Sequence, residues 1–283
     1  SQDIINGFFS AIPEHYRANF QFYPEYIDRG NYELVKVAVN KLVTFHNVDI
    51  VSGIISYKVV PEIVSIIEQR KKIAFFFDLG EYLPPLNSYS QLIFFNSMQM
   101  WQMEYALGRW AHKNINGKGS VFMSVYEAGY HMHSSFCKGA FTAGAEEMDI
   151  HVLPFDPNVR NFETQVKLYL DKISQSKIDY LHVLFCGNEA VDFYKVYKES
   201  ALYNKIPLIV SPHMASTEIL DKIVDAGQKV YTASGWNYGS TSEQNIAFKR
   251  SFQLFSGKKA SEFGVMGYEM GVMFETLIPY FSK

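Results

Sequence analysis

The segment from Gly117 to Pro212 alternates regularly between apolar runs and helical patterns, and this alternation constrains the fold more than any other feature. The apolar runs cover residues 120–126, 150–155, 180–185 and 207–210, and the helical patterns between them cover 129–147, 162–174 and 190–201. Strands that are apolar throughout and separated by helices predict a parallel sheet that is covered on both faces. Ligands of such sheets bind outside the carboxyl ends of the strands, so functional residues are expected there.

The rest of the chain continues the same alternation. Further helices are expected at 4–12, 31–45, 61–69, 99–111, 217–226, 243–255 and 264–281, and further strands at 20–23, 48–55, 73–77, 92–95 and 229–232. A chain of 283 residues is long enough to form two lobes. The predicted fold class is therefore α/β with two Rossmann-like or flavodoxin-like lobes. Lobe 1 is expected to contain residues 1–97 and 235–283, and lobe 2 residues 98–234.

Charge and hydropathy argue against a nucleic-acid or membrane partner. The formal net charge is −3 and the charges are interspersed, so the chain has no basic footprint for nucleic acid and no polybasic patch for a membrane surface. No apolar run approaches the roughly 20 residues that span a bilayer, so we expect no membrane insertion. The chain has 23 Phe and 19 Tyr; this much Tyr also suits a groove that binds a small ligand, although most of the 19 are expected to be ordinary core and surface residues.

The common catalytic and cofactor motifs do not occur. Neither a Gly-x-Gly-x-x-Gly turn nor a P-loop follows a strand, and the chain has no Gly-x-Ser-x-Gly or His-Glu-x-x-His. Cys137 and Cys186 do not have the spacing of a zinc site with the histidines. We expect two free thiols, with a disulfide between them as the alternative. No nucleophile, base and anion hole converge. We therefore expect no cofactor, no metal and no enzymatic activity.

Candidate ligand-binding residues lie at the carboxyl ends of the predicted strands or in the turns that follow them. They are Ser56, Tyr57, Gly80, Glu81, Tyr82, Tyr126, Tyr130, Gly187, Asn188, His213 and Trp236. Hydroxyls, aromatic rings and few charges suit a small polar or amphipathic ligand. A structural role is the alternative for several of them: the glycines could serve turns, Ser56 could cap a helix, Trp236 could pack between lobes, and His213 could be an ordinary loop histidine.

Several segments, in this order, resemble the type I periplasmic solute-binding proteins of the Leu/Ile/Val receptor branch. The segments are DIINGFFSAI (3–12), VSGIISYKVVP (51–61), 117–130, 161–179, NKIPLIVSP (204–212) and SGKKASEFGVMGYEM (256–270). The resemblance implies two α/β lobes joined by a hinge of three crossovers that close over a solute. It further implies a periplasmic or other extracytoplasmic location with the signal peptide removed. The partner would be an ABC permease or a membrane sensor.

The same resemblance assigns roles to residues. Ser56 or Tyr57, together with Gly80 and Glu81, would hold a ligand carboxylate, while lobe 2 would contribute 128–130, 186–188 and His213. The family's first strand would precede Asp3, and more chain would follow Phe281.

Two departures from the family pattern bear on the ligand. His213 stands about where an acidic residue would pair with a ligand ammonium, and Ala128 stands where an aromatic residue is expected beside Gly129. Because these changes disfavour a standard α-amino acid, we predict a carboxylate-bearing or polar small metabolite, amino-acid-like or aromatic, taken up by an ABC transporter. The alternative is a ligand sensor that signals to a partner protein by cleft closure. An enzyme on the same sheet is a third class with little support.

Overall fold

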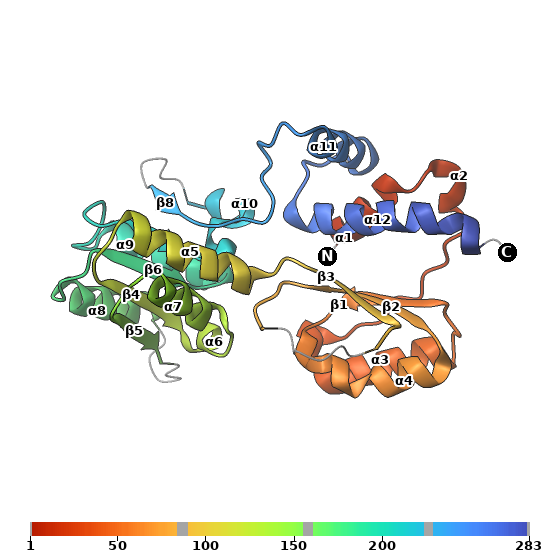
Figure 1. The fold of residues 1–283 in the computed structure, drawn as a ribbon, viewed down its shortest axis with the longest axis horizontal. Coiled ribbons are helices and arrows are strands. Elements are labelled where there is room, and N and C mark those ends of the chain that lie inside the picture. Colours follow the sequence, from red (N-terminus) through yellow and green to blue (C-terminus); the bar gives the residue numbers. More distant parts are fainter. Residues whose placement is uncertain (1, 84–89, 155–160, 224–228, 282–283) are drawn as a thin grey trace. The chain divides into compact units, whose positions relative to one another are not determined.

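The computed structural model describes residues 2–83, 90–154, 161–223 and 229–281, and it divides the chain into two compact units. Unit 1 consists of residues 1–80, 84–98 and 236–283, and unit 2 of residues 81–83 and 99–235. Each unit contains one parallel sheet, which confirms the predicted α/β class. Figure 1 shows the elements of both units.

The sheet of unit 1 has three parallel strands in the order β1-β2-β3, namely Ile50–Ile54, Ile73–Asp78 and Ile93–Ser97. Helices α3 (Tyr32–Thr44) and α4 (Val64–Arg70) cover one face, where aliphatic residues such as Val39 and Ile67 pack on Phe76. Helices α1 (Gln2–Ala11) and α12 (Glu262–Phe281) cover the other face. The strands are therefore apolar on both sides, as the parallel sheet requires.

Helices α1 and α12 approach each other at glycines. A Cβ on Gly7 would collide with the backbone of Gly264, and a Cβ on Gly267 would collide with the carbonyl oxygen of Ile4. The two helices can therefore pack backbone against backbone only because these side chains are missing. α2 (Glu14–Arg17) and α11 (Glu243–Ser256) lie beside them, whereas the 3-10 turn η1 (Asp28–Gly30) contacts α3.

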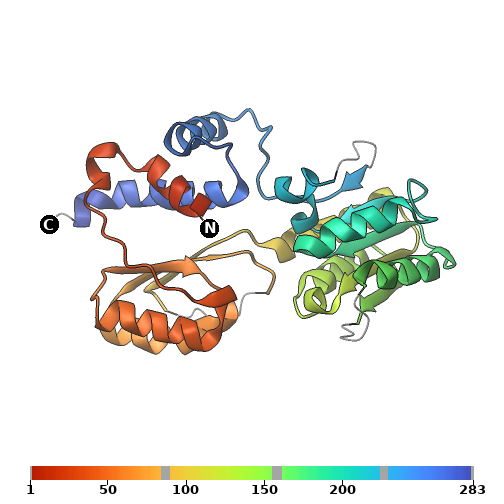
Figure 2. The same cartoon turned by 180° about the vertical axis from the view of Figure 1, so that it is seen from behind.

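The sheet of unit 2 has five parallel strands in the order β5-β4-β6-β7-β8. They are β4 (Gly119–Ser124), β5 (Met148–Leu153), β6 (Tyr180–Leu184), β7 (Leu208–Val210) and β8 (Val230–Tyr231). Helices α8 (Phe162–Ser174) and α9 (Gly187–Lys198) cover one face, and α5 (Met100–Asn114) and α7 (Met132–Thr142) cover the other. Figure 2, seen from behind, brings α8 and α9 to the front.

Side chains along β4 and β6 alternate between the two faces. Phe122 and Val183 join the cluster formed with α8 and α9. His182 points to the opposite face and stacks on Phe136 of α7, with ring centroids 3.8 Å apart. Its Nε2 lies 2.8 Å from Oε2 of Glu104 in α5, and both side chains are fully buried. This pair is the buried polar contact between α5 and the sheet.

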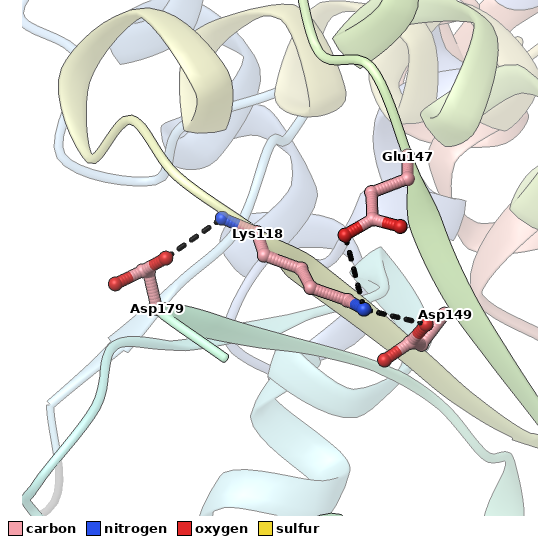
Figure 3. A network of polar contacts seen from close by, with 4 residues as sticks. All are labelled: Lys118, Glu147, Asp149 and Asp179. Carbon is pink, nitrogen blue, oxygen red and sulfur yellow. Dashed lines mark hydrogen bonds and ion pairs between the residues drawn. The ribbon is translucent and has the colours of Figure 1, made fainter. Parts of the chain in front are cut away.

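Polar contacts connect neighbouring strands at the amino-terminal edge of the same sheet (Figure 3). Lys118 precedes β4, and its Nζ lies 3.1 Å from Glu147 and 3.1 Å from Asp149 at the start of β5. Its backbone N–H donates to Asp179 just before β6, at 2.7 Å. Lys118 therefore links three neighbouring strands at the edge opposite their carboxyl ends.

Most of the predicted helices and strands are present, with shifted ends. One predicted strand is absent, and three other predicted elements have a different extent or type in the structure. Residues 20–23 form no strand. The helix expected at 61–69 is a 3-10 turn, η2 (Tyr57–Glu62), followed by α4, because Ser56 caps the turn early. The apolar run 120–126 ends at Ser124, whose hydroxyl accepts the N–H of Glu127 and starts α6 (Val125–Ala128). The helix expected at 217–226 is seen as α10 (Thr217–Leu220); residues 224–226 and Phe155 lie outside the described part.

Candidate ligand-binding site

Sheet order places the carboxyl ends of β4, β6 and β7 side by side in unit 2. The residues that follow these strands are Tyr126 and Tyr130 after β4, Gly187 and Asn188 after β6, and His213 after β7. The parallel sheet therefore gathers five of the predicted residues along one edge, as expected for a ligand site.

The two tyrosines after β4 form a pair. The hydroxyl of Tyr130 donates to the hydroxyl of Tyr126 at 2.6 Å, and the rings meet edge to face with centroids 5.2 Å apart. The side chain of Tyr126 is 56% exposed, so part of the pair is open to solvent. Burial raises the pKa of both phenols, so both carry their protons at neutral pH.

Residues 81–83 belong to this site although they are distant from it in sequence. The N–H of His131 donates to the carbonyl of Glu81 at 2.9 Å, and the N–H of Leu83 donates to Nδ1 of His131, also at 2.9 Å. The ring of Tyr82 lies 5.0 Å from that of Tyr130. Tyr82, Tyr126 and Tyr130 thus form one group, which we call the tyrosine cluster.

The end of β6 provides a helix start with exposed polar groups. Gly187 adopts a left-handed conformation with φ +54 as the first residue of α9, and Asn188 beside it is exposed. The side chain of Cys186 does not cap the helix. Burial raises the pKa of Glu189, and its hydrogen bond with Ser124 at the end of β4 opposes that rise.

His213 lies in the 3-10 turn η3 (Pro212–Ala215) that follows β7. Its Nε2 lies 3.9 Å from Oε1 of Glu81, which is too long for a hydrogen bond. Burial lowers the pKa of His213 to about 4, so the imidazole is neutral at pH 7 and the contact is not an ion pair.

Glu127 is an acidic residue at this site that the predicted ligand-binding set does not include. Its side chain is 1% exposed, and its two carboxylate oxygens accept no hydrogen bond of ordinary geometry within the described part of the chain. Burial raises its pKa to about 7, although the neighbouring Cys186 thiol opposes this, and the charges of Glu104 and Glu189 raise it further. Its place just after a strand marks it as a candidate, but only the folded structure reveals its burial.

Unit 1 has a smaller group at the carboxyl ends of β1, β2 and β3. Ser56 accepts the N–H of Lys58 at 3.3 Å, so its expected capping role is present. Burial raises the pKa of Tyr57, which bonds to Ser97. Gly80, with φ +77, donates its N–H to Oδ1 of Asp78 at 2.8 Å.

Asp78 is a second acidic residue at a strand end that the predicted ligand-binding set does not include. It is the last residue of β2 and is 2% exposed, and burial raises its pKa. The N–H groups of Gly80, Tyr57 and Leu79 oppose that rise.

Trp236 is the predicted residue that is packed into a core. Its Nε1 donates to Oδ1 of Asn245 in α11 at 2.7 Å, and its ring meets those of Tyr238 and Phe248. The structure thus brings together Glu81, Tyr82, Tyr126, Tyr130 and His213 in unit 2, and separately Ser56, Tyr57 and Gly80 in unit 1.

The described residues contain no group of three His, Cys, Asp or Glu side chains arranged to hold a metal ion. Cys137 and Cys186 are both free, with Cys137 buried and Cys186 half-buried, which confirms the expected thiols. No helix within the described ranges is both long and apolar enough to span a membrane.

The sequence profile described as "Periplasmic binding protein" matches residues 27–278. The chain belongs to this family. The resemblance to its type I, Leu/Ile/Val-binding-like branch is confirmed, and members of this family are solute-binding proteins and not enzymes.

Solved structures of family members share the fold. An ABC transporter substrate-binding protein from Sphaerobacter thermophilus is 20% identical, with a TM-score of 0.79 over 99% of this chain and 76% of that one. A solute-binding protein from Rhodopseudomonas palustris BisB5, in complex with 3,4-dihydroxybenzoic acid, is 21% identical, with a TM-score of 0.76 over 100% and 77%. LivJ from Streptococcus pneumoniae, in complex with isoleucine, is 12% identical, with a TM-score of 0.69 over 97% and 78%. No curated protein matches the chain.

Proposed function

We propose that this periplasmic binding protein captures a small carboxylate-bearing or polar metabolite outside the cytoplasm and delivers it to an ABC permease. The observation that carries the proposal is the grouping of Tyr82, Tyr126, Tyr130 and His213 at the carboxyl edge of the five-stranded sheet. Hydroxyls, ring edges and a neutral imidazole on one edge can orient a small polar solute. No observation favours the sensor alternative.

We further propose that unit 1 supplies the second part of the binding surface, through Ser56, Tyr57 and the backbone at Gly80. The Ser56 hydroxyl accepts a backbone N–H and keeps its own proton free to donate to a ligand oxygen. Asn188 and Gly187 would add exposed polar groups from α9. The two units correspond in this proposal to the two lobes that close over the solute.

The substrate class is the open part of the proposal. The related structures hold an aromatic acid in one case and isoleucine in another, and both are less than 25% identical to this chain. Amino-acid-like and aromatic acids are therefore both candidates. Tight binding of leucine or valine that is lost in His213→Ala would argue for a standard amino acid and against our expectation.

A thermal-shift screen tests the proposal. The panel contains amino acids, aromatic and aliphatic carboxylates, sugars and small amides. A solute present at about 1,000 times its dissociation constant stabilises the folded state by about 4 kcal/mol, which gives an easily measured rise in Tm.

Matched variants then locate the site. The shift should be lost in Ser56→Ala and in His213→Ala, whereas Ser52→Ala, at an exposed position of β1, should keep it. No shift across the panel, with no co-purified small molecule in native mass spectrometry, would contradict the proposal.

A further inference from the structure

One edge of the sheet of unit 2 is open. Strand β5 stands at the end of the strand order β5-β4-β6-β7-β8, and among the described residues no strand pairs with its outer side (Figure 1). Every residue of β4 and β6 is buried, whereas in β5 only Leu153 is buried and Ile150 is 51% exposed. The outer backbone N–H and C=O groups of β5 can therefore pair with a further strand.

The sequence of β5 lacks the features that usually keep an edge strand from pairing, which are short length, proline, lysine and bulges. The strand has six residues, MDIHVL, none of which is proline or lysine, and its register with β4 contains no bulge. Its one carboxylate, Asp149, is already paired with Lys118, whose Nζ lies 3.1 Å away. At the opposite end of the sheet, β8 has only two residues. The edge of β5 is therefore the more favourable of the two for strand pairing.

A mainly apolar groove lies beside the open edge. It has a volume of about 550 Å³, and Phe141 of α7 and Ile150 of β5 form part of its lining. Both side chains are about half exposed, at 47% for Phe141 and 51% for Ile150. Covering them removes apolar surface from water, which favours association. The hydrophobic driving force and the free backbone groups of β5 thus lie at the same place.

The sequence of β5 is complementary to a second copy of itself. Two identical strands that pair across a twofold axis run antiparallel, and residues that face each other come from the same side of the sheet. When Ile150 faces Ile150 of the second copy, Met148 faces Val152, so these contacts are apolar. Asp149 then faces His151, so a carboxylate meets a ring N–H donor. The two neighbouring registers place Asp149 against Asp149 or His151 against His151 and are therefore less favourable.

We propose that two copies of this chain associate through β5, with the two strands antiparallel and Ile150 of each copy at the twofold axis. The two five-stranded sheets then form one continuous sheet. In each copy the groove between α7 and β5 lies at the interface, which covers Phe141 and Ile150. This inference goes beyond the proposed solute binding and does not depend on it, because none of the predicted ligand-binding residues lies in β5 or α7.

Sedimentation velocity of the full chain tests the proposal. The wild type should shift from monomer to dimer as its concentration rises from the micromolar to the submillimolar range. Ile150→Lys and Ile150→Glu each place two like charges at the axis, so each should raise the dissociation constant of the dimer by about tenfold or more. Mixed in equal amounts at low salt, the two variants should associate with each other, because lysine then faces glutamate. Leu254→Lys is the matched control, because it adds the same charge at an exposed leucine of α11 in unit 1 and should associate like the wild type.

Hydrogen exchange of the wild-type protein provides a second test that needs no variant. The amides of β5 should exchange more slowly at high than at low protein concentration, whereas those of β8 should not change. A wild type that stays monomeric over the whole concentration range would overturn the proposal. Dimers that persist in both Ile150 variants would also overturn it, and so would a mixture of the two variants that remains monomeric, because Ile150 would then not lie at the axis.

Discussion

Replacing Glu127 by glutamine directly tests whether the ionised form of this buried carboxyl group destabilises the folded protein. The carboxyl group is 1% exposed, and burial raises its pKa from 4.5 to about 7. At 1.36 kcal/mol per pH unit, this difference corresponds to about 3 kcal/mol of stability that the ionised carboxylate costs the folded state. Glu104 from α5, Glu189 from α9 and the Cys186 thiol are the titratable groups that face it.

The pH dependence follows from the sign of the shift. Between pH 4.5 and about 7 the folded state holds a proton on Glu127 that the unfolded state has lost. Stability therefore falls as pH rises through this window, and this contribution levels off above pH 7. Glu127→Gln cannot ionise, so it should match the wild type near pH 4.5 and exceed its stability by up to about 3 kcal/mol at pH 8.

Urea denaturation followed by tryptophan fluorescence measures this difference. Of the three tryptophans, Trp101 and Trp110 lie in α5 of unit 2 and Trp236 belongs to unit 1, so two of the three fluorophores report the unit that contains Glu127. Glu147→Gln, the exposed control, should change stability by no more than about 1 kcal/mol at either pH. A Glu127→Gln protein no more stable than wild type at pH 8, or one whose difference does not vary with pH, would refute the reasoning.

Three further changes probe the packing of unit 2, each by urea denaturation. Glu104→Leu alone should cost about 3–5 kcal/mol because it leaves buried His182 without its acidic partner, and adding His182→Phe should recover most of that loss. A double variant as unstable as the single one would contradict this. Gly108→Ala should destabilise the protein, because the added Cβ would collide with the carbonyl oxygen of Phe136. This loss should exceed the gain of about 1 kcal/mol that alanine brings to a helix. Its control in the same helix, exposed Ala106→Gly, should cost only about 1 kcal/mol. Lys118→Ala should lower the stability only slightly, and less at high salt, because its ion pairs are exposed to solvent; a large loss that does not depend on salt would contradict this.

The sequence by itself determined the α/β class and most elements of unit 2, because these depend on local patterns. The run 120–126 is apolar because β4 is buried on both faces, and residues 162–174 are amphipathic because α8 covers one face of the sheet. The carboxyl ends of parallel strands lie at the same edge of a sheet, which is why residues after β4, β6 and β7 could be expected at one edge. Residues 20–23 failed as a strand because an apolar, aromatic run becomes a strand only when another strand pairs with it.

Only the tertiary structure decided the chemistry of the site. Burial sets the charge of Glu127 and His213, and burial depends on neighbours that are remote in sequence. The same holds for Glu81 and Tyr82, which join the site through the bond between Leu83 and His131, 48 residues apart. The sequence shows which side chains can take part in the site. Solvent exclusion and long-range contacts in the folded chain decide their protonation and their partners.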